Sequence, residues 1–171
     1  MTVKLLSNEH AVMQIRMAYE ADLSEIQDLL RANDLPTEDI SNALIEGFLI
    51  AEDASGSIIG IGGLEQLGAS GLLRSLAVVP EARGQGIAHA LVASLEDRAR
   101  AAGQHHIWLL TTTAEEFFER LGYERVKRDA VPDAVGSCRQ FAALCPSTAS
   151  CMRKRLHTAS SAPVTERPVS D

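Results

Sequence analysis

The spacing of apolar residues divides this chain into strand-like and helix-like segments. Apolar residues at every second position, or in short runs between turn residues, predict strands. We expect these strands over residues 14–19, 47–53, 57–67, 72–79, 106–112, 123–128 and 149–155. Apolar residues three and four positions apart predict helices. We expect these helices over residues 22–33, in a short segment after Thr37, and over residues 87–103, 114–122 and 133–144.

Cap and turn residues support this division. Asp22, followed three residues later by Glu25, predicts a helix N-cap with a capping box. The turn residues at 53–56 predict a hairpin between the two strands that flank them. Residues 72–79 are mostly apolar, which is typical of a central strand. The order of elements predicts an α+β domain with a meander of strands around one central strand–turn–helix unit.

The length of 171 residues predicts a single domain with a proper core. Residues 1–13 have no clear period and are expected to be a leader. The domain is expected over residues 14–156. Residues 157–171 are rich in Ser, Thr and Pro without apolar spacing, so we expect a disordered tail.

The charge and the cysteine content limit which classes of partner the protein can bind and in which cellular compartment it is expected. The net charge of −7 argues against nucleic acid or an acidic membrane as the main partner. No apolar stretch reaches membrane-spanning length, and the N-terminal segment does not resemble a secretory signal. The three cysteines, Cys138, Cys145 and Cys151, make a poor disulfide framework. These features predict a cytoplasmic protein that acts on a small molecule.

A glycine turn follows the central strand and carries the clearest chemistry. Its residues are Arg83, Gly84, Gln85, Gly86, Ile87 and Ala88. Glycine lets a ligand approach the backbone, and the first amides of the next helix are free to bind an anion such as diphosphate. A Walker loop is excluded because no Gly-Lys-Ser/Thr run exists. A dinucleotide fingerprint is unsupported because His89 stands where its third glycine is required.

The pattern Arg83-x-x-Gly86-x-Ala88 after an apolar strand resembles the coenzyme A loop of the GCN5-related N-acetyltransferase (GNAT) superfamily. The likeness extends to the first strand and helix and to "AEEFFERLGYE", and covers most of the chain. It implies a GNAT fold, with a mixed, mostly antiparallel sheet of six to seven strands and helices on both faces. It implies acetyl-coenzyme A as cosubstrate and no metal. It also implies backbone contacts to the pantetheine arm at Leu76, Ala77 and Val78.

The chain departs from the family pattern at Phe118. Many members carry a tyrosine at this position, next to the coenzyme, and that tyrosine protonates the leaving thiolate. Phe118 has no proton to give, so we predict that no dedicated acid is needed. A thiolate is a tolerable leaving group, because thiols have pKa values near 8.5.

Two charged residues are candidates for acceptor chemistry. Glu65, beside the central strand, is the predicted base for the attacking amine; the alternative is a solvated glutamate. Arg74 interrupts an apolar strand, where an unpaired charge is costly. It is predicted either to hold a substrate carboxylate in two parallel bonds or to pair with an internal acid such as Glu65.

Two narrower likenesses bear on the acceptor. The segment "WLLTTTAEEFFERLGYE" resembles the acetyltransferase domain of N-acetylglutamate synthase, which implies acceptor contacts at Thr111, Thr112 and Thr113. Segments including "LLRSLAVVP" and "QFAALCPSTASCMRKRL" resemble bacterial N-acetyltransferases associated with arsenic-resistance operons. Both imply transfer to the α-amino group of a glutamate-like amino acid or an antimetabolite of the arsinothricin or phosphinothricin type. Arg139 and Arg120 are weaker candidates for holding its acidic groups.

Other functions stay open on the sequence alone. The three cysteines can be read as a thiol site for arsenite, although Cys145 and Cys151 fit no common metal spacing. A coenzyme A-binding adaptor without turnover is a second alternative. Because the late strands often form dimers in this superfamily, the resemblance also leaves a homodimer open.

Overall fold

The computed structural model of the protein describes residues 13–157. The predicted leader and tail therefore lie outside the described residues, apart from Met13 and His157, and stay predictions. The described chain forms one mixed sheet of seven strands in the order β1-β2-β3-β4-β5-β7-β6. The strands are β1 (Gln14–Met17), β2 (Phe48–Glu52), β3 (Ile58–Leu67), β4 (Ser70–Val78), β5 (His106–Thr111), β6 (Glu124–Val126) and β7 (Ser150–Arg155).

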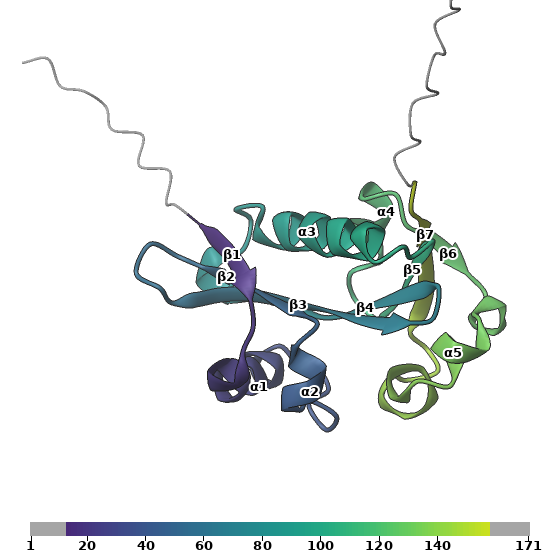
Figure 1. Ribbon diagram of the computed structural model, residues 1–171, viewed down its shortest axis with the longest axis horizontal. Helices are drawn as coiled ribbons and strands as arrows, with labels where there is room; N and C mark the ends of the chain where they lie inside the picture. Colours follow the sequence, from purple (N-terminus) through teal and green to yellow (C-terminus); the bar gives the residue numbers. More distant parts are fainter. Residues whose placement is uncertain (1–12, 158–171) are drawn as a thin grey trace, which may run out of the picture.

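Helices cover both faces of this sheet (Figure 1). One face carries α3 and α4, and the other carries α1, α2, α5 and the π-helical segment η4. Only β4 and β5 run parallel, and every other pair is antiparallel. The predicted fold class is thus confirmed. The helical segments are η1 (Glu20–Asp22), α1 (Leu23–Ala32), α2 (Asn42–Ile45), η2 (Pro80–Ala82), α3 (Ile87–Ala101), α4 (Glu115–Arg120), η3 (Arg128–Ala130), α5 (Asp133–Gly136) and η4 (Gln140–Leu144).

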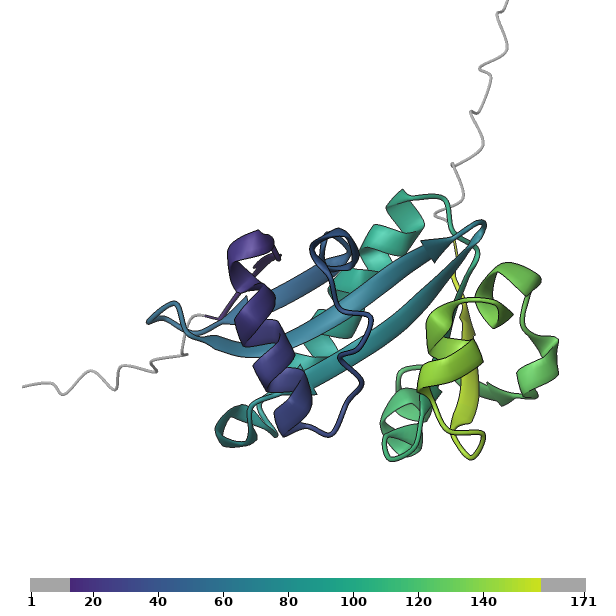
Figure 2. The same ribbon diagram turned by 90° about the horizontal axis from the view of Figure 1, so that it is seen from below.

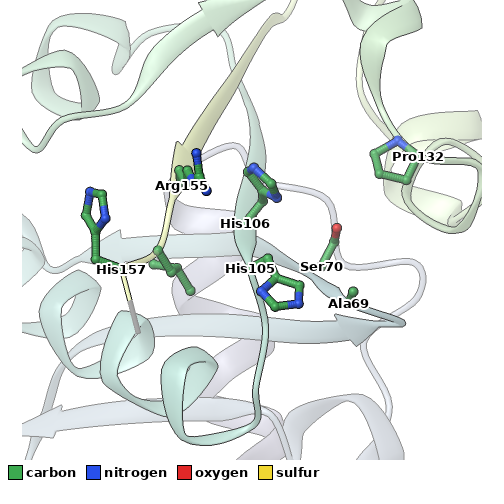
Figure 3. Close-up of a pocket in the computed structure, with 8 residues that line it drawn as sticks. Ala69, Ser70, His105, His106, Pro132, Arg155 and His157 are labelled. Carbon is green, nitrogen blue, oxygen red and sulfur yellow. The ribbon is translucent and has the colours of Figure 1, made fainter. Parts of the chain in front are cut away.

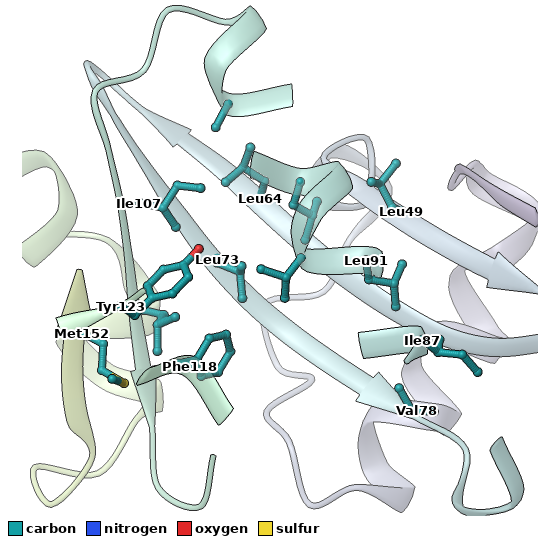
Figure 4. Close-up of a cluster of buried hydrophobic side chains, with 14 of the residues drawn as sticks. Leu49, Leu64, Leu73, Val78, Ile87, Leu91, Ile107, Phe118, Tyr123 and Met152 are labelled. Atoms are coloured by element: carbon teal, nitrogen blue, oxygen red, sulfur yellow. The ribbon is translucent and has the colours of Figure 1, made fainter. Parts of the chain in front are cut away.

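The largest buried cluster lies between the sheet and α3 (Figure 4). Leu91 and Leu95 of α3 are fully buried against it. The helix comes close because β3 has glycines beneath it: a Cβ on Gly60 would lie only 2.8 Å from Cγ2 of Ile87. This close packing fixes the start of α3, and with it the glycine turn, relative to the central strands.

The predicted capping box at Asp22 is wrong. Asp22 does precede α1, but its side chain makes no cap bond to that helix. Its carboxylate instead accepts hydrogen bonds from both terminal nitrogens of Arg16, at 2.8 and 2.9 Å. It also accepts one from the backbone N–H of Tyr19. Arg16 of β1 thus engages this carboxylate in place of the first amides of α1, and its hydrogen bonds are the main cause of the lowered pKa of Asp22.

Two helix predictions also need correction. The short helix expected after Thr37 begins only at Asn42, because the Ser41 hydroxyl caps it by accepting from the N–H of Leu44. The helix expected over residues 133–144 is broken into α5 and η4. Strand β6 covers only Glu124–Val126, whereas the expected strand spans residues 123–128.

The central strand carries a bulge that opens the sheet. Ser75 has a φ of +57°, and the β3–β4 register shifts between Ile61 and Gly63. On the other side, the parallel ladder between β4 and β5 ends where Leu72 pairs with Trp108. Beyond that point the β5-facing backbone of β4 has no ladder partner among residues 13–157. This divergence creates the space in which the candidate site lies.

Candidate functional site

A groove of about 700 Å³ opens at the end of β4. We call it the turn groove, because the glycine turn forms one wall and the end of α1 another. The loop between β5 and α4 completes it. Its lining includes Asn33, Leu76, Ala77, Val78, Arg83, Gly84, Gly86, Ile87, Ala88, Thr113 and Phe117. Of the residues predicted to contact the coenzyme, Gln85 and Phe118 are absent from this lining.

The glycine turn has the geometry of an anion cradle. Gly84 and Gly86 have φ values of +77° and +81°, in the left-handed region that favours glycine. A Cβ added at either position would have no heavy atom within 4 Å, so the space beside the backbone is open. Gly86 is the N-cap of α3, a helix of 15 residues, whose first amides have no partner within the helix. These amides and the helix dipole suit a diphosphate.

The side chain of Arg83 stabilises this turn through two hydrogen bonds. Its Nε donates to the carbonyl of Val78 at 3.2 Å, and its Nη2 donates to Oδ1 of Asn33 at 2.7 Å. The side chain therefore ties the turn to the end of β4 and to the end of α1. Sequence reasoning missed Asn33, because a contact 50 residues away leaves no local signal.

A second pocket, of about 320 Å³, lies deeper between the diverging strands. We call it the Arg74 pocket. Its lining includes Arg74, Ser75, Leu76, Leu109, Thr111, Thr112, Thr113, Phe118, Gln140, Cys145 and Pro146. Asp34, Leu76, Thr113 and Ala114 line both this pocket and the turn groove. The two spaces therefore meet at the bulge of β4.

Arg74 lies in an ionic cluster. Its side chain is 1% exposed, and Nη1 and Nη2 bond the two carboxylate oxygens of Asp39 at 2.5 and 2.8 Å. Nη1 also donates to Glu65 at 3.1 Å, and Nε donates to the Ser75 hydroxyl at 3.2 Å. Burial lowers the pKa of Arg74, but Asp39 and Glu65 together outweigh burial and raise it. The parallel pair of bonds predicted for a substrate carboxylate is thus made by Asp39.

The other predicted acceptor residues occupy different places. Glu65 accepts a hydrogen bond from Arg74, which lines the Arg74 pocket. Glu65 itself lines a separate hollow beside α2. Thr111 uses its hydroxyl to accept from the N–H of Ala114 at the start of α4. Thr112 and Thr113 are exposed at the rim. Phe118 is 4% exposed and packs edge-on against the ring of Tyr123, so it belongs to the core as well as to the pocket wall.

Burial raises the pKa values of Cys138, Cys145 and Cys151. At neutral pH they are therefore held as thiols, the less reactive form. In the described part of the chain, no group of three or more His, Cys, Asp and Glu side chains is placed to hold a metal ion. No helix within that part is long and apolar enough to cross a bilayer.

A hollow of about 480 Å³ lies at the opposite end of β5 (Figure 3). We call it the histidine hollow, because His105, His106 and His157 line it together with Arg155. It contains none of the residues predicted for the site. Because Arg155 contributes a positive charge to its lining, this hollow is a second place in the described part of the chain where an anion can bind.

Known proteins resemble this chain in sequence. Residues 45–125 match the family described as acetyltransferase (GNAT) domain. An amino-acid acetyltransferase of Neisseria meningitidis is 26% identical over 134 residues, which cover 73% of this chain and 30% of that protein. One from Pseudomonas syringae is 39% identical over 72 residues, or 42% of this chain and 17% of that protein. The chain thus spans less than a third of the length of these relatives.

Solved structures resemble it over most of its length. N-acetylglutamate synthase from Neisseria gonorrhoeae, complexed with coenzyme A and N-acetyl-glutamate, matches 87% of this chain and 36% of its own with a TM-score of 0.76 and 24% identity. Rv2747 from Mycobacterium tuberculosis, in complex with CoA, matches 84% of this chain and 99% of its own with a TM-score of 0.73 and 25% identity. Residues 45–125 of this chain thus match the acetyltransferase (GNAT) domain family, and the described chain shares the fold of these structures.

Proposed function

We propose that this protein transfers the acetyl group of acetyl-coenzyme A to the α-amino group of a small, glutamate-like amino acid. The observation that carries the proposal is the junction of the turn groove and the Arg74 pocket at Leu76. A carrier held in the groove and an amine held in the pocket would meet at this residue. Similar proteins named amino-acid acetyltransferases, and a similar synthase that holds coenzyme A with N-acetyl-glutamate, support this reading.

Each part of the chain has a defined task in this reaction. The open amides of the glycine turn hold the diphosphate. The β5-facing backbone of β4 near Leu76 to Val78, which has no ladder partner on that side, binds the arm and polarises the acetyl carbonyl. Acetyl-coenzyme A supplies the acetyl group as a thioester. Arg74 has five N–H donors, of which four are used, so one Nη2 hydrogen remains for the acceptor. Arg120, 77% exposed and beside Glu116, contributes less.

An acceptor screen tests the proposal. Free thiol released from acetyl-coenzyme A would be measured with glutamate, its phosphinic and arsinic analogues, and a set of polyamines. We expect release with glutamate-like acceptors, including the antimetabolites to which the sequence likeness points. Release with polyamines alone would contradict the proposed acceptor class. Binding of acetyl-coenzyme A without thiol release for any acceptor would favour the coenzyme A-binding adaptor. In a separate measurement, the protein's own cysteine thiols would be counted with arsenite added; their loss, without any acetyl transfer, would favour the thiol site.

Glu65 is proposed as the base that accepts the proton of the amine, directly or through water. Replacing Glu65 by Gln keeps a hydrogen-bond acceptor for Arg74 but removes the carboxylate. We expect the maximal rate to fall on the order of 100-fold and the shape of the pH–rate profile to change, because the proposed proton acceptor is gone. The measurement is kcat as a function of pH. A variant whose pH–rate profile matches that of the parent would remove Glu65 from the mechanism.

A further inference from the structure

Gln140 carries an unsatisfied polar atom at the acceptor site. The residue is 7% exposed and lines the Arg74 pocket. Its Nε2 donates to the Cys145 sulfur at 3.0 Å, whereas its Oε1 has no hydrogen-bond partner among residues 13–157. Buried polar side-chain atoms in folded proteins almost always have a partner. A group that enters the pocket can supply the missing one.

The segment that carries Gln140 is held firmly in place. Gln140 begins η4, a π-helical turn, which is a rare geometry found frequently at functional sites. Arg128 donates to the carbonyls of Phe141 and Pro146, at 3.0 and 2.8 Å. Phe141 packs in the cluster that contains Trp108. Because both ends of the segment are fixed, the amide of Gln140 is preorganised for a ligand.

The chemistry of the pocket selects what this oxygen would bind. A carbonyl oxygen only accepts hydrogen bonds, so it needs an N–H or O–H donor. A glutamate-like acceptor at neutral pH has carboxylates, which only accept, and one nitrogen, which donates. The cluster of Arg74 with Asp39 and Glu65 sums to one positive and two negative charges, a net charge of −1. Both features favour an ammonium or amine nearby.

We propose that Oε1 of Gln140 accepts a hydrogen bond from the α-amino group of the acceptor and positions that nitrogen for attack. This inference rests on the proposed function, because it assigns the amine of that reaction to a specific atom. It makes Gln140 a specificity residue for substrates with a free amino group.

The test compares two variants and two ligands. Gln140→Leu removes the amide at the pocket. Gln104→Leu is the matched control, because Gln104 is also buried, at 2% exposed, with an unpartnered Oε1, yet lines neither the turn groove nor the Arg74 pocket. Binding of glutamate and of glutarate, which lacks the amino group, would be measured with coenzyme A present. We expect Gln140→Leu to weaken glutamate binding about 10- to 100-fold and to leave glutarate binding unchanged.

The remaining outcomes are equally informative. Gln140→Glu keeps an acceptor oxygen, so it should retain more glutamate binding than Gln140→Leu. If Gln140→Leu binds both ligands as the parent does, or loses both equally, the inference is overturned while the proposed function stands. If the parent binds coenzyme A but neither binds nor acetylates glutamate, the proposed function fails and the inference falls with it. Melting temperatures of all three variants report whether each is folded.

Discussion

Replacing Gly86 by valine should abolish coenzyme A binding while the protein stays folded. Gly86 has a φ of +81°, which is a strained conformation for a β-branched residue. The new side chain would also occupy the open space in front of the first amides of α3. A diphosphate would lose several hydrogen bonds at once, so we expect affinity to fall by more than about 100-fold. Calorimetry with coenzyme A measures the change.

The same chain offers a matched control for backbone strain. Gly56, in the turn between β2 and β3, has a φ of +82° and open space around it. Gly56→Val should therefore destabilise the protein by a similar amount, on the order of 1–2 kcal/mol, and bind coenzyme A normally. Equal loss of binding in both variants, or no loss in Gly86→Val, would show that the glycine turn is not the coenzyme cradle.

Replacing Arg74 by methionine should cause the largest loss of stability of any change at the site. The substitution leaves the carboxylate of Asp39 mostly buried without its bidentate partner. Breaking one side of a buried ion pair costs about 3–5 kcal/mol. We expect a clear drop in the urea midpoint of unfolding. The KM for the amino-acid acceptor should also rise far more than the KM for acetyl-coenzyme A.

A second substitution separates these two effects. In the double variant Arg74→Met with Asp39→Leu, both members of the ion pair are removed, so neither leaves an unpaired buried charge. Replacing a buried ion pair by apolar residues often leaves stability unchanged. Glu65 remains partly exposed and can be hydrated. Most of the stability should therefore return, while the KM for the acceptor stays high. A double variant with parental KM would show that Arg74 serves stability alone.

Local features of the sequence were sufficient to predict the glycine turn and its neighbours. The apolar run of β4, the two glycines and the amphipathic face of α3 are consecutive in the chain, so spacing alone reveals them. The same holds for the hairpin of β2 and β3, whose turn chemistry is local.

The Arg74 pocket depends on contacts between residues far apart in the sequence, which the spacing of residues along the chain does not predict. Arg74 stood out as a charge in an apolar strand, but its main partner, Asp39, lies 35 residues away in a loop without a pattern. Gln140 reaches the pocket on η4, which Arg128 holds through the carbonyls of Phe141 and Pro146, and such contacts between distant segments leave no spacing signal. The insertion of β7 between β5 and β6 is likewise a pairing of distant segments.

A crystal structure of the protein with coenzyme A tests the central claim most directly. We predict that the diphosphate accepts hydrogen bonds from the backbone amides of residues 84–88 and that the arm runs along β4 toward Leu76. A diphosphate bound elsewhere, for example in the histidine hollow beside Arg155, would contradict the account.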